Sequence, residues 1–326
     1  MNIEYFKKKI KVQSISKVPG NEARDKTKKI LIYQHGDFHT EISGFLIYNY
    51  ANCDIDIYYP HTNSTNNCFK YYESILKKKI NYVDKVDEKI YAYIFILTSR
   101  EIKLFNNIVD KKKYILFKHV NEDITDNFIN ISLTPLVKAN INVMPIYNNT
   151  NEKKRENNIC IIGNMSCGKI RDLDGIANLI KKLKKYEILI FTRKIDEKYK
   201  QIYTKYQNVK IYINLGTTEM IERIQKSKYI LTADTEYYNE NGIKSGVLTG
   251  MIPLALNNDI PLIMTSKLNK IYGLDGVIEY SNMMDVANKL NLMSDIKYNS
   301  LTQIFIENKN KIINSNKKKL ITFIKL

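Results

Sequence analysis

A short polar segment, HGDFHTE, directly follows the first strongly apolar run of the chain and gathers residue types that transfer protons. It holds His35, Asp37, His39 and Glu41, and so two of the four histidines of the chain. The apolar run before it predicts a buried strand, and the helical spacing of the apolar residues after it predicts a helix. Histidine and aspartate can act as general bases when their pKa is tuned to the reaction. We therefore predict His39 as a base, with Asp37 or His35 as substitutes.

Two other interpretations of this segment stay open. Asp37 could cap the following helix while the histidines pack partly buried against it. The two histidines could also bind a metal, but they flank a turn and no third ligand is evident, so we predict no metal site.

A second informative segment, KSGVLTGMIPLALNNDIPLIM, opens with small residues and leads into an apolar helix and a strand. Ser245, Gly246, Thr249 and Gly250 leave the amides of a first helical turn uncovered. Uncovered amides and the helix dipole suit a phosphate, so we predict an anion-binding helix start. Plain capping of the helix is the alternative.

Further polar residues follow predicted strands of the second half. Gly163, Asn164, Met165 and Ser166 form one such loop, Asn214, Leu215 and Gly216 another, and Asp234 through Ser245 a third. Four cations, Lys169, Arg171, Arg193 and Lys194, could neutralise a diphosphate or could be plain surface charges.

The elements that position these residues alternate between strand and helix. Apolar runs that predict strands begin at residues 29, 54, 90, 113 and 128, and again at 158, 186, 209, 228, 260 and 276. Such alternation favours parallel sheets, and 326 residues exceed one ordinary core. We predict an α/β protein with two Rossmann-like, doubly wound domains and a ligand cleft between them.

The predicted domain limits follow changes in composition. Residues 1–150 form the N-terminal domain, with a polar arm at 1–27, and residues 151–158 form a polar, charged linker. Residues 159–297 form the C-terminal domain. Residues 298–326 read as one or two amphipathic helices that could pack back on the N-terminal domain.

The composition limits the kinds of partner that the chain could bind. The net charge of +17 is compatible with a nucleic acid or an acidic glycan, but the lysines are spread in runs over the whole chain and mostly indicate solvated surfaces. Four cysteines without paired spacing favour a reducing compartment. The sequence has no secretory signal and no long apolar window, which predicts a soluble, cytoplasmic protein without a transmembrane segment.

The second half resembles the donor domain of glycosyltransferases with the GT-B fold, most specifically between Gly163 and Met264. The Ser-Gly segment is similar to the Ser-Gly-Ala-x-Thr helix of the bacterial lipid-linked N-acetylglucosamine transferase type. The resemblance implies that Ser245, Gly246 and Thr249 face the diphosphate and ribose of a nucleotide sugar. It also implies that the loop from Asn214 to Gly216 flanks the base, and that no metal is needed.

One departure from this resemblance concerns glutamates. Retaining members of a large nucleotide-sugar family carry two glutamates separated by seven residues, whereas the corresponding partner of Glu236 here is Lys244, and that of Glu240 is Leu248. This slightly favours an inverting reaction, although Glu236 could still hold hydroxyls of the donor sugar.

The prediction is therefore a glycosyltransferase of the hexosyltransferase type. It would use a UDP- or GDP-sugar as co-substrate, without a permanently bound cofactor, and a glycan, protein or lipid-linked acceptor. Alternatives are a sugar-nucleotide 2-epimerase of the same fold, a nucleic-acid-binding or DNA-modifying protein, and a catalytically silent transferase-like subunit.

Overall fold

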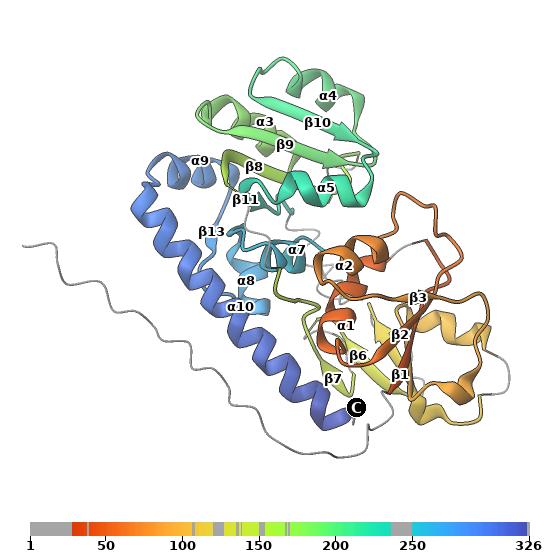
Figure 1. Cartoon of the computed structure of the whole chain (residues 1–326). Coiled ribbons are helices and arrows are strands. Elements are labelled where there is room, and N and C mark those ends of the chain that lie inside the picture. Colours follow the sequence, from red (N-terminus) through yellow and green to blue (C-terminus); the bar gives the residue numbers. More distant parts are fainter. Residues whose placement is uncertain are drawn as a thin grey trace, which may run out of the picture.

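The structure is a computed structural model that describes residues 28–37, 39–105, 108–119, 127–134, 137, 139–149, 154–166, 168, 170–235 and 250–324. Within these ranges the chain forms two α/β halves, each built on a parallel sheet (Figure 1). The α/β prediction with two doubly wound sheets is confirmed.

The N-terminal half holds a seven-stranded sheet in the order β3-β2-β1-β4-β5-β6-β7. Its strands are β1 (Lys29–Tyr33), β2 (Asp54–Tyr58), β3 (Asn81–Tyr82), β4 (Tyr93–Ile96), β5 (Tyr114–Lys118), β6 (Ile129–Ser132) and β7 (Ile141–Asn142). Its helices are α1 (Ser43–Asn49) and α2 (Phe69–Ile75), with short 3-10 turns η1 (Thr40–Ile42), η2 (Glu88–Ile90), η3 (Ser99–Leu104) and η4 (Lys111–Lys113).

The C-terminal half repeats this plan with a six-stranded sheet in the order β10-β9-β8-β11-β12-β13. Its strands are β8 (Glu156–Ile162), β9 (Glu187–Thr192), β10 (Val209–Ile213), β11 (Ser227–Leu231), β12 (Leu262–Thr265) and β13 (Ile278–Tyr280). Its helices are α3 (Leu173–Lys182), α4 (Glu197–Tyr203), α5 (Thr217–Ile224), α7 (Met251–Asn257), α8 (Ser266–Tyr272), α9 (Met283–Asn291) and α10 (Asp295–Phe323).

The central strands are apolar on both faces because helices and loops cover both sides of each sheet. In β1, Ile30, Leu31 and Ile32 are all fully buried, and Ile30 and Leu31 belong to different core clusters. A continuous apolar run is what a parallel strand buried on both faces requires. The first strand of each sheet is therefore fixed in the middle of its half.

Helix α3 shows how the sequence sets a helix of the second half. Asp172 caps its first turn by accepting a hydrogen bond from the Gly175 amide at 2.9 Å. The predicted apolar stripe faces the core, where Leu173, Ile176 and Leu179 are buried. The helix therefore lies as its 3.6-residue period predicts.

Several short elements of the described chain were not predicted, and one strand begins earlier than predicted. Strands β3 and β7 have two residues each and the 3-10 turns η1 to η4 have three to six, so they are too short to carry a periodic signal, and the seven-residue helix α8 was also not predicted. Strand β8 begins at Glu156, inside the predicted linker, because the Glu156 amide donates to the Lys226 carbonyl at 2.7 Å. Pairing with β11 thus extends the strand into a polar segment.

The last helix joins the two halves. Figure 1 shows α10 running from the end of α9 past the C-terminal half to the region of β7. Near its end, the Asn316 side chain donates to the Met144 carbonyl at 2.7 Å, and Leu320 and Ile324 join the core of the N-terminal half. In the described part of the chain, no helix is both long and apolar enough to cross a membrane.

Candidate active site

Two adjoining cavities lie between the halves, at the carboxyl ends of strands of the C-terminal sheet. The larger, of about 350 Å³, is lined by Glu41, Tyr72, Pro145, Ile162, Gly163, Arg171, Arg193, Thr217, Met220, Ile221, Gly250, Met251, Pro253, Leu254 and Asn257. The smaller, of about 280 Å³, is lined by Asn66, Ile162, Gly163, Asn164, Phe191, Thr192, Arg193, Tyr212, Asn214, Leu215, Thr217 and Met220. Gly163 and Arg193 belong to both, so the cavities meet at the loops after β8 and β9. Ligands of doubly wound proteins bind at this edge.

The loop after β8 needs a glycine at its first position. Gly163 has φ +126°, a backbone conformation that favours glycine, and a Cβ atom there would stand 2.7 Å from a guanidinium nitrogen of Arg171. Arg171 is buried and forms an ion pair with Asp234, whose side chain is also buried. Glycine therefore lets a neutralised arginine approach the backbone beside the larger cavity.

Arg193, after β9, has a different environment. It is exposed, and its Nη2 atom donates to the Asn66 side-chain oxygen at 3.1 Å across the two halves. Among the residues that the structure describes, no carboxylate lies within ion-pair distance of Arg193. Within the described residues, its guanidinium therefore has no carboxylate to compensate its positive charge at the junction of the cavities.

The other predicted residues of these loops divide into lining and supporting positions. Asn164 and Leu215 line the smaller cavity, as does Asn214, which adopts the left-handed conformation with φ 55°. Gly216 lies next to them and caps α5. Lys194 supports the loop through its carbonyl, which accepts from the Thr192 hydroxyl at 2.6 Å, and it lines neither cavity.

Several predicted donor-site residues lie outside the described residues, namely Lys169, Glu236, Ser245, Gly246 and Thr249. The next described element is α7, which begins at Met251 with Gly250 as its N-cap. Gly250 and Met251 line the larger cavity.

On the N-terminal side, the loop after β1 is held by a buried carboxylate. Glu101 on η3 accepts hydrogen bonds from the amides of His35 and Gly36 at 2.9 and 2.8 Å and from the Gln34 side chain at 3.1 Å. The His35 ring turns toward Tyr58, with 6.4 Å between ring centroids, and it does not line either cavity. His35 therefore contributes its backbone to this loop.

Asp37 is bonded to a neighbouring loop. Its carboxylate accepts from the hydroxyls of Tyr59 and Ser64 at 2.5 and 2.8 Å and from the Asn66 amide at 3.1 Å. Burial opposes ionisation, but these hydrogen bonds outweigh it and hold the pKa of Asp37 below its ordinary value. A carboxylate with three donors and a lowered pKa is a weak base, so its environment favours a positioning role.

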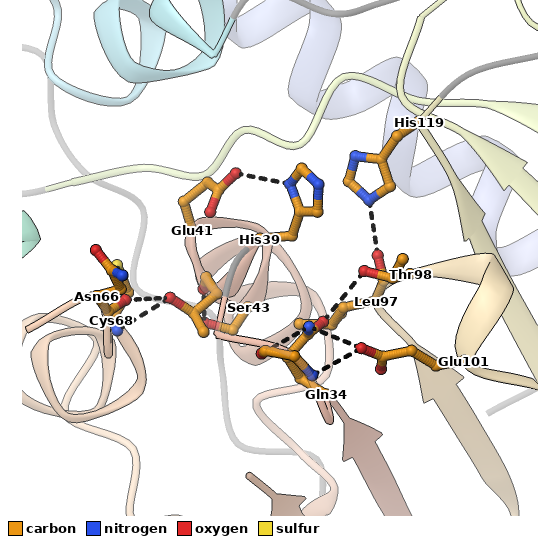
Figure 2. A network of polar contacts seen from close by, with 12 residues as sticks. Gln34, His39, Glu41, Ser43, Asn66, Cys68, Leu97, Thr98, Glu101 and His119 are labelled. Atoms are coloured by element: carbon orange, nitrogen blue, oxygen red, sulfur yellow. Dashed lines mark hydrogen bonds and ion pairs between the residues drawn. The ribbon is translucent and has the colours of Figure 1, made fainter. Parts of the chain in front are cut away.

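His39 and Glu41, the predicted base and its neighbour, face each other at the start of α1, as Figure 2 shows; His39 itself lines neither cavity. His39 has φ 60°, and its Nδ1 atom lies 3.3 Å from a Glu41 oxygen. The Glu41 side chain is about half exposed, with an exposed fraction of 52%, and it lines the larger cavity. Desolvation opposes its ionisation, but the hydrogen bond and charge of His39 outweigh that effect and lower the pKa of Glu41.

A third residue, His119, completes this group and was not predicted. Its ring stacks on that of His39 with 3.7 Å between centroids, and its Nε2 atom lies 2.7 Å from the Leu97 carbonyl (Figure 2). His119 follows β5, and carboxyl ends of parallel strands meet at one edge. The rule that residues after parallel strands meet at one edge, applied to each histidine and to Glu101 after β4, would have found both residues.

The described residues of both halves give the site two chemical sides. The C-terminal side offers the guanidinium of Arg193 and a backbone opened by Gly163, which suit a phosphate anion. The N-terminal side offers an imidazole paired with a carboxylate, which suits proton transfer. The described residues contain no group of three or more histidine, cysteine or acidic side chains that could hold a metal ion.

Comparisons with solved structures agree with this architecture. The chain is similar to the S. aureus TarM variant in complex with Fondaparinux, alpha-GlcNAc-glycerol and UDP, at 12% identity and TM-score 0.54, over 91% of this chain and 99% of that one. It is similar to Anabaena HepE in complex with UDP-glucose, at 12% identity and TM-score 0.53, over 91% and 100% of the two chains. No protein-family model and no curated protein matches the sequence.

The chain is also similar in structure to an epimerase. The UDP-GlcNAc 2-epimerase from Neisseria meningitidis bound to UDP-GlcNAc matches at 10% identity and TM-score 0.51, over 90% of this chain and 100% of that one. The fold of the chain is thus the GT-B fold, in which two Rossmann-like domains face each other.

Proposed function

We propose that the chain transfers a sugar from a nucleoside-diphosphate sugar to a hydroxyl acceptor. One observation carries this proposal: the interlobe cavities are lined on one side by the guanidinium of Arg193, which has no carboxylate partner among the described residues, and on the other by Glu41, which pairs with His39. A diphosphate leaving group needs the first, and an attacking hydroxyl needs the second. The solved structures that contain UDP or UDP-glucose in the same fold support it.

The C-terminal half would hold the donor. Arg193 would face the diphosphate, and Asn214 and Leu215 would flank the base in the smaller cavity. The resemblance of the Ser-Gly segment adds the amides near Ser245, Gly246 and Thr249 to this set. Together these groups would stabilise the charge that develops on the departing diphosphate.

The N-terminal half would hold the acceptor and His39 as general base. With Nδ1–H donated to Glu41, the lone pair of a neutral His39 lies on Nε2. The acceptor O–H would pass its proton to Nε2 as its oxygen forms a bond to the anomeric carbon. The bond from that carbon to the diphosphate breaks with its electron pair leaving on the diphosphate, which inverts the anomeric centre. Glu41 would stabilise the imidazolium that forms.

The residues present require no metal for this reaction. Arg193 already supplies a cation beside the cavities, and the acceptor could be a glycan, a protein or a lipid-linked sugar. These details of acceptor, inversion and metal independence rest on the site alone and belong to the proposal.

The test is a thermal-shift panel of UDP-, GDP-, ADP-, TDP- and CMP-sugars, followed by a transfer assay with the sugar that binds. A ligand of the donor site raises the unfolding temperature by mass action. Stabilisation by one class of nucleotide sugar is expected, together with transfer that requires His39. A chain that none of these compounds stabilises would refute the proposal.

Epimerisation of a nucleotide sugar is a second candidate, because a UDP-GlcNAc 2-epimerase shares the fold over 90% of this chain. Incubation of the donor without an acceptor separates the two. An epimerised sugar nucleotide would favour the epimerase, whereas turnover that depends on added acceptor would favour the transferase.

A further inference from the structure

A loop of the N-terminal half, residues 59–67, reaches across to the C-terminal half at two points. Asn66 accepts a hydrogen bond from Arg193 at 3.1 Å, and the Thr65 carbonyl accepts one from the Thr217 amide at 2.9 Å. Thr217 is the first residue of α5, and Arg193 follows β9. We call this segment the bridging loop.

Asp37 holds the bridging loop in shape. Its two carboxylate oxygens accept from Tyr59, Ser64 and Asn66, which lie near the start, middle and end of the loop. Burial and the neighbouring Asp37 raise the pKa of Tyr59, so that hydroxyl stays protonated and continues to donate. The Asn66 carbonyl is also bonded, by the Thr40 hydroxyl at 2.6 Å.

The chemistry of these partners fixes which way the Asn66 amide points. A carboxylate can only accept hydrogen bonds and a guanidinium can only donate them. The Asn66 Nδ2 atom must therefore face Asp37, and its Oδ1 atom must face Arg193, as the structure has them. An aspartate at this position could not donate to Asp37, and a lysine could not accept from Arg193.

Because the Asn66 amide is neutral, its hydrogen bond to Arg193 does not cancel the positive charge of the guanidinium. Arg171 pairs directly with the Asp234 carboxylate, so its charge is compensated inside the protein. Arg193 is oriented by an amide instead, and the negative charge of Asp37 stays on the far side of Asn66. Arg193 is thereby held in place without losing its attraction for an anion.

We propose that Asn66 is a positioning residue that aims Arg193 of the opposite half at the donor diphosphate, with Asp37 holding Asn66. The inference rests on the proposed function. Under this proposal, Arg193 is oriented toward the diphosphate only while the two halves are in contact. A diphosphate would therefore bind more tightly when the bridging loop is in contact with the C-terminal half.

The test compares a nucleoside diphosphate with its own nucleoside, because only the diphosphate should sense Arg193. The probe is the tightest binder among UDP, GDP, ADP and TDP, measured by calorimetry on the full chain. Asn66→Ala is expected to weaken diphosphate binding about threefold to tenfold, the size of one lost positioning hydrogen bond, and to leave nucleoside binding unchanged. Asn63→Ala, an exposed position in the same loop, should change neither.

A double-mutant cycle with Arg193→Ala completes the test. If Asn66 acts through Arg193, then Asn66→Ala has no further effect in the Arg193→Ala background. Asn66→Asp should weaken diphosphate binding at least as much as alanine, because a carboxylate would compensate the guanidinium.

Two outcomes would overturn the positioning role while leaving the proposed function intact. One is equal weakening of nucleoside and diphosphate, which would indicate a general disturbance of the loop. The other is additivity of the two substitutions. A wild-type chain that binds none of the diphosphates would refute the proposed function itself, and the positioning role with it.

Discussion

The loops that follow β1 and β8 occupy equivalent places in the two sheets, yet they are built for different tasks. After β1, the amides of His35 and Gly36 are already bound to the Glu101 carboxylate. After β8, Gly163 opens the backbone beside a cavity and two arginines lie near it. In Rossmann-like folds such a loop commonly receives the phosphates of a nucleotide.

This difference supports the proposal that the C-terminal half takes the nucleotide. A protein carboxylate occupies the amides of the N-terminal loop, so a phosphate would have to displace it against charge repulsion. The C-terminal loop instead has within reach a cation, Arg193, that pairs with no carboxylate of the described residues. Topology makes the two edges alike, and the charges of a few side chains make one suitable for proton transfer and the other for a diphosphate.

The largest expected effect separates turnover from binding. His39→Ala should lower kcat about 100-fold to 10,000-fold, the usual contribution of a general base, and leave donor affinity unchanged. Steady-state kinetics with the donor found by thermal shift would measure both. His35→Ala is the matched control, because the His35 ring lies near Tyr58 and not beside Glu41, so this variant should leave kcat nearly intact. Full activity in His39→Ala would reject His39 as the base.

The two arginines of the C-terminal edge give the next contrast. Arg171→Ala leaves the buried carboxylate of Asp234 without its ion-pair partner, so the free energy of unfolding should fall by about 3 kcal/mol. Urea denaturation measures this change. Arg193→Ala, at an exposed arginine, serves as the control and should leave stability almost unchanged. Equal stability of the Arg171→Ala and wild-type chains would show that the pair is not structural.

Arg193, whose loss should hardly affect stability, should matter strongly for ligand binding. Arg193→Ala should weaken diphosphate binding by about 2 kcal/mol, or roughly 30-fold, because a charged hydrogen-bond donor is lost. Calorimetry with the nucleoside diphosphate measures the loss. Lys210→Ala removes an exposed positive charge that pairs with Glu187 away from both cavities, and it should bind normally. The same loss in both variants would indicate long-range attraction instead of a contact.

The smallest effect concerns pH and the N-terminal loop. The pKa of Asp37 in the folded chain lies below its ordinary value of 3.8, so the ionised carboxylate stabilises the fold at higher pH. This contribution is lost as the pH falls through the lowered pKa. The difference in urea midpoint between wild type and Asp37→Asn should be constant from about pH 7 to about pH 5 and shrink at lower pH. A difference that grows on acidification would contradict the assigned hydrogen bonds.

Many of the candidate site residues were predicted because they follow apolar runs. His39 and Glu41 stand directly after the first strand, and Gly163, Arg193 and Asn214 follow strands of the second sheet. Asn66 lies in the loop after β2, so the rule covers it, but it was not singled out, and its contact with Arg193 forms only across the two halves. His119 and Glu101 were accessible to the rule but were not singled out.

The sequence by itself determined the two sheets, because buried parallel strands require continuous apolar runs and their periodic helices are read locally. It also determined which residue types stand at the carboxyl ends of those strands. Only the tertiary structure decided which of these residues meet. The partners of Asp37, Arg171 and Arg193 come from distant parts of the chain, and hydrogen bonds and ion pairs depend on distances that no local pattern encodes.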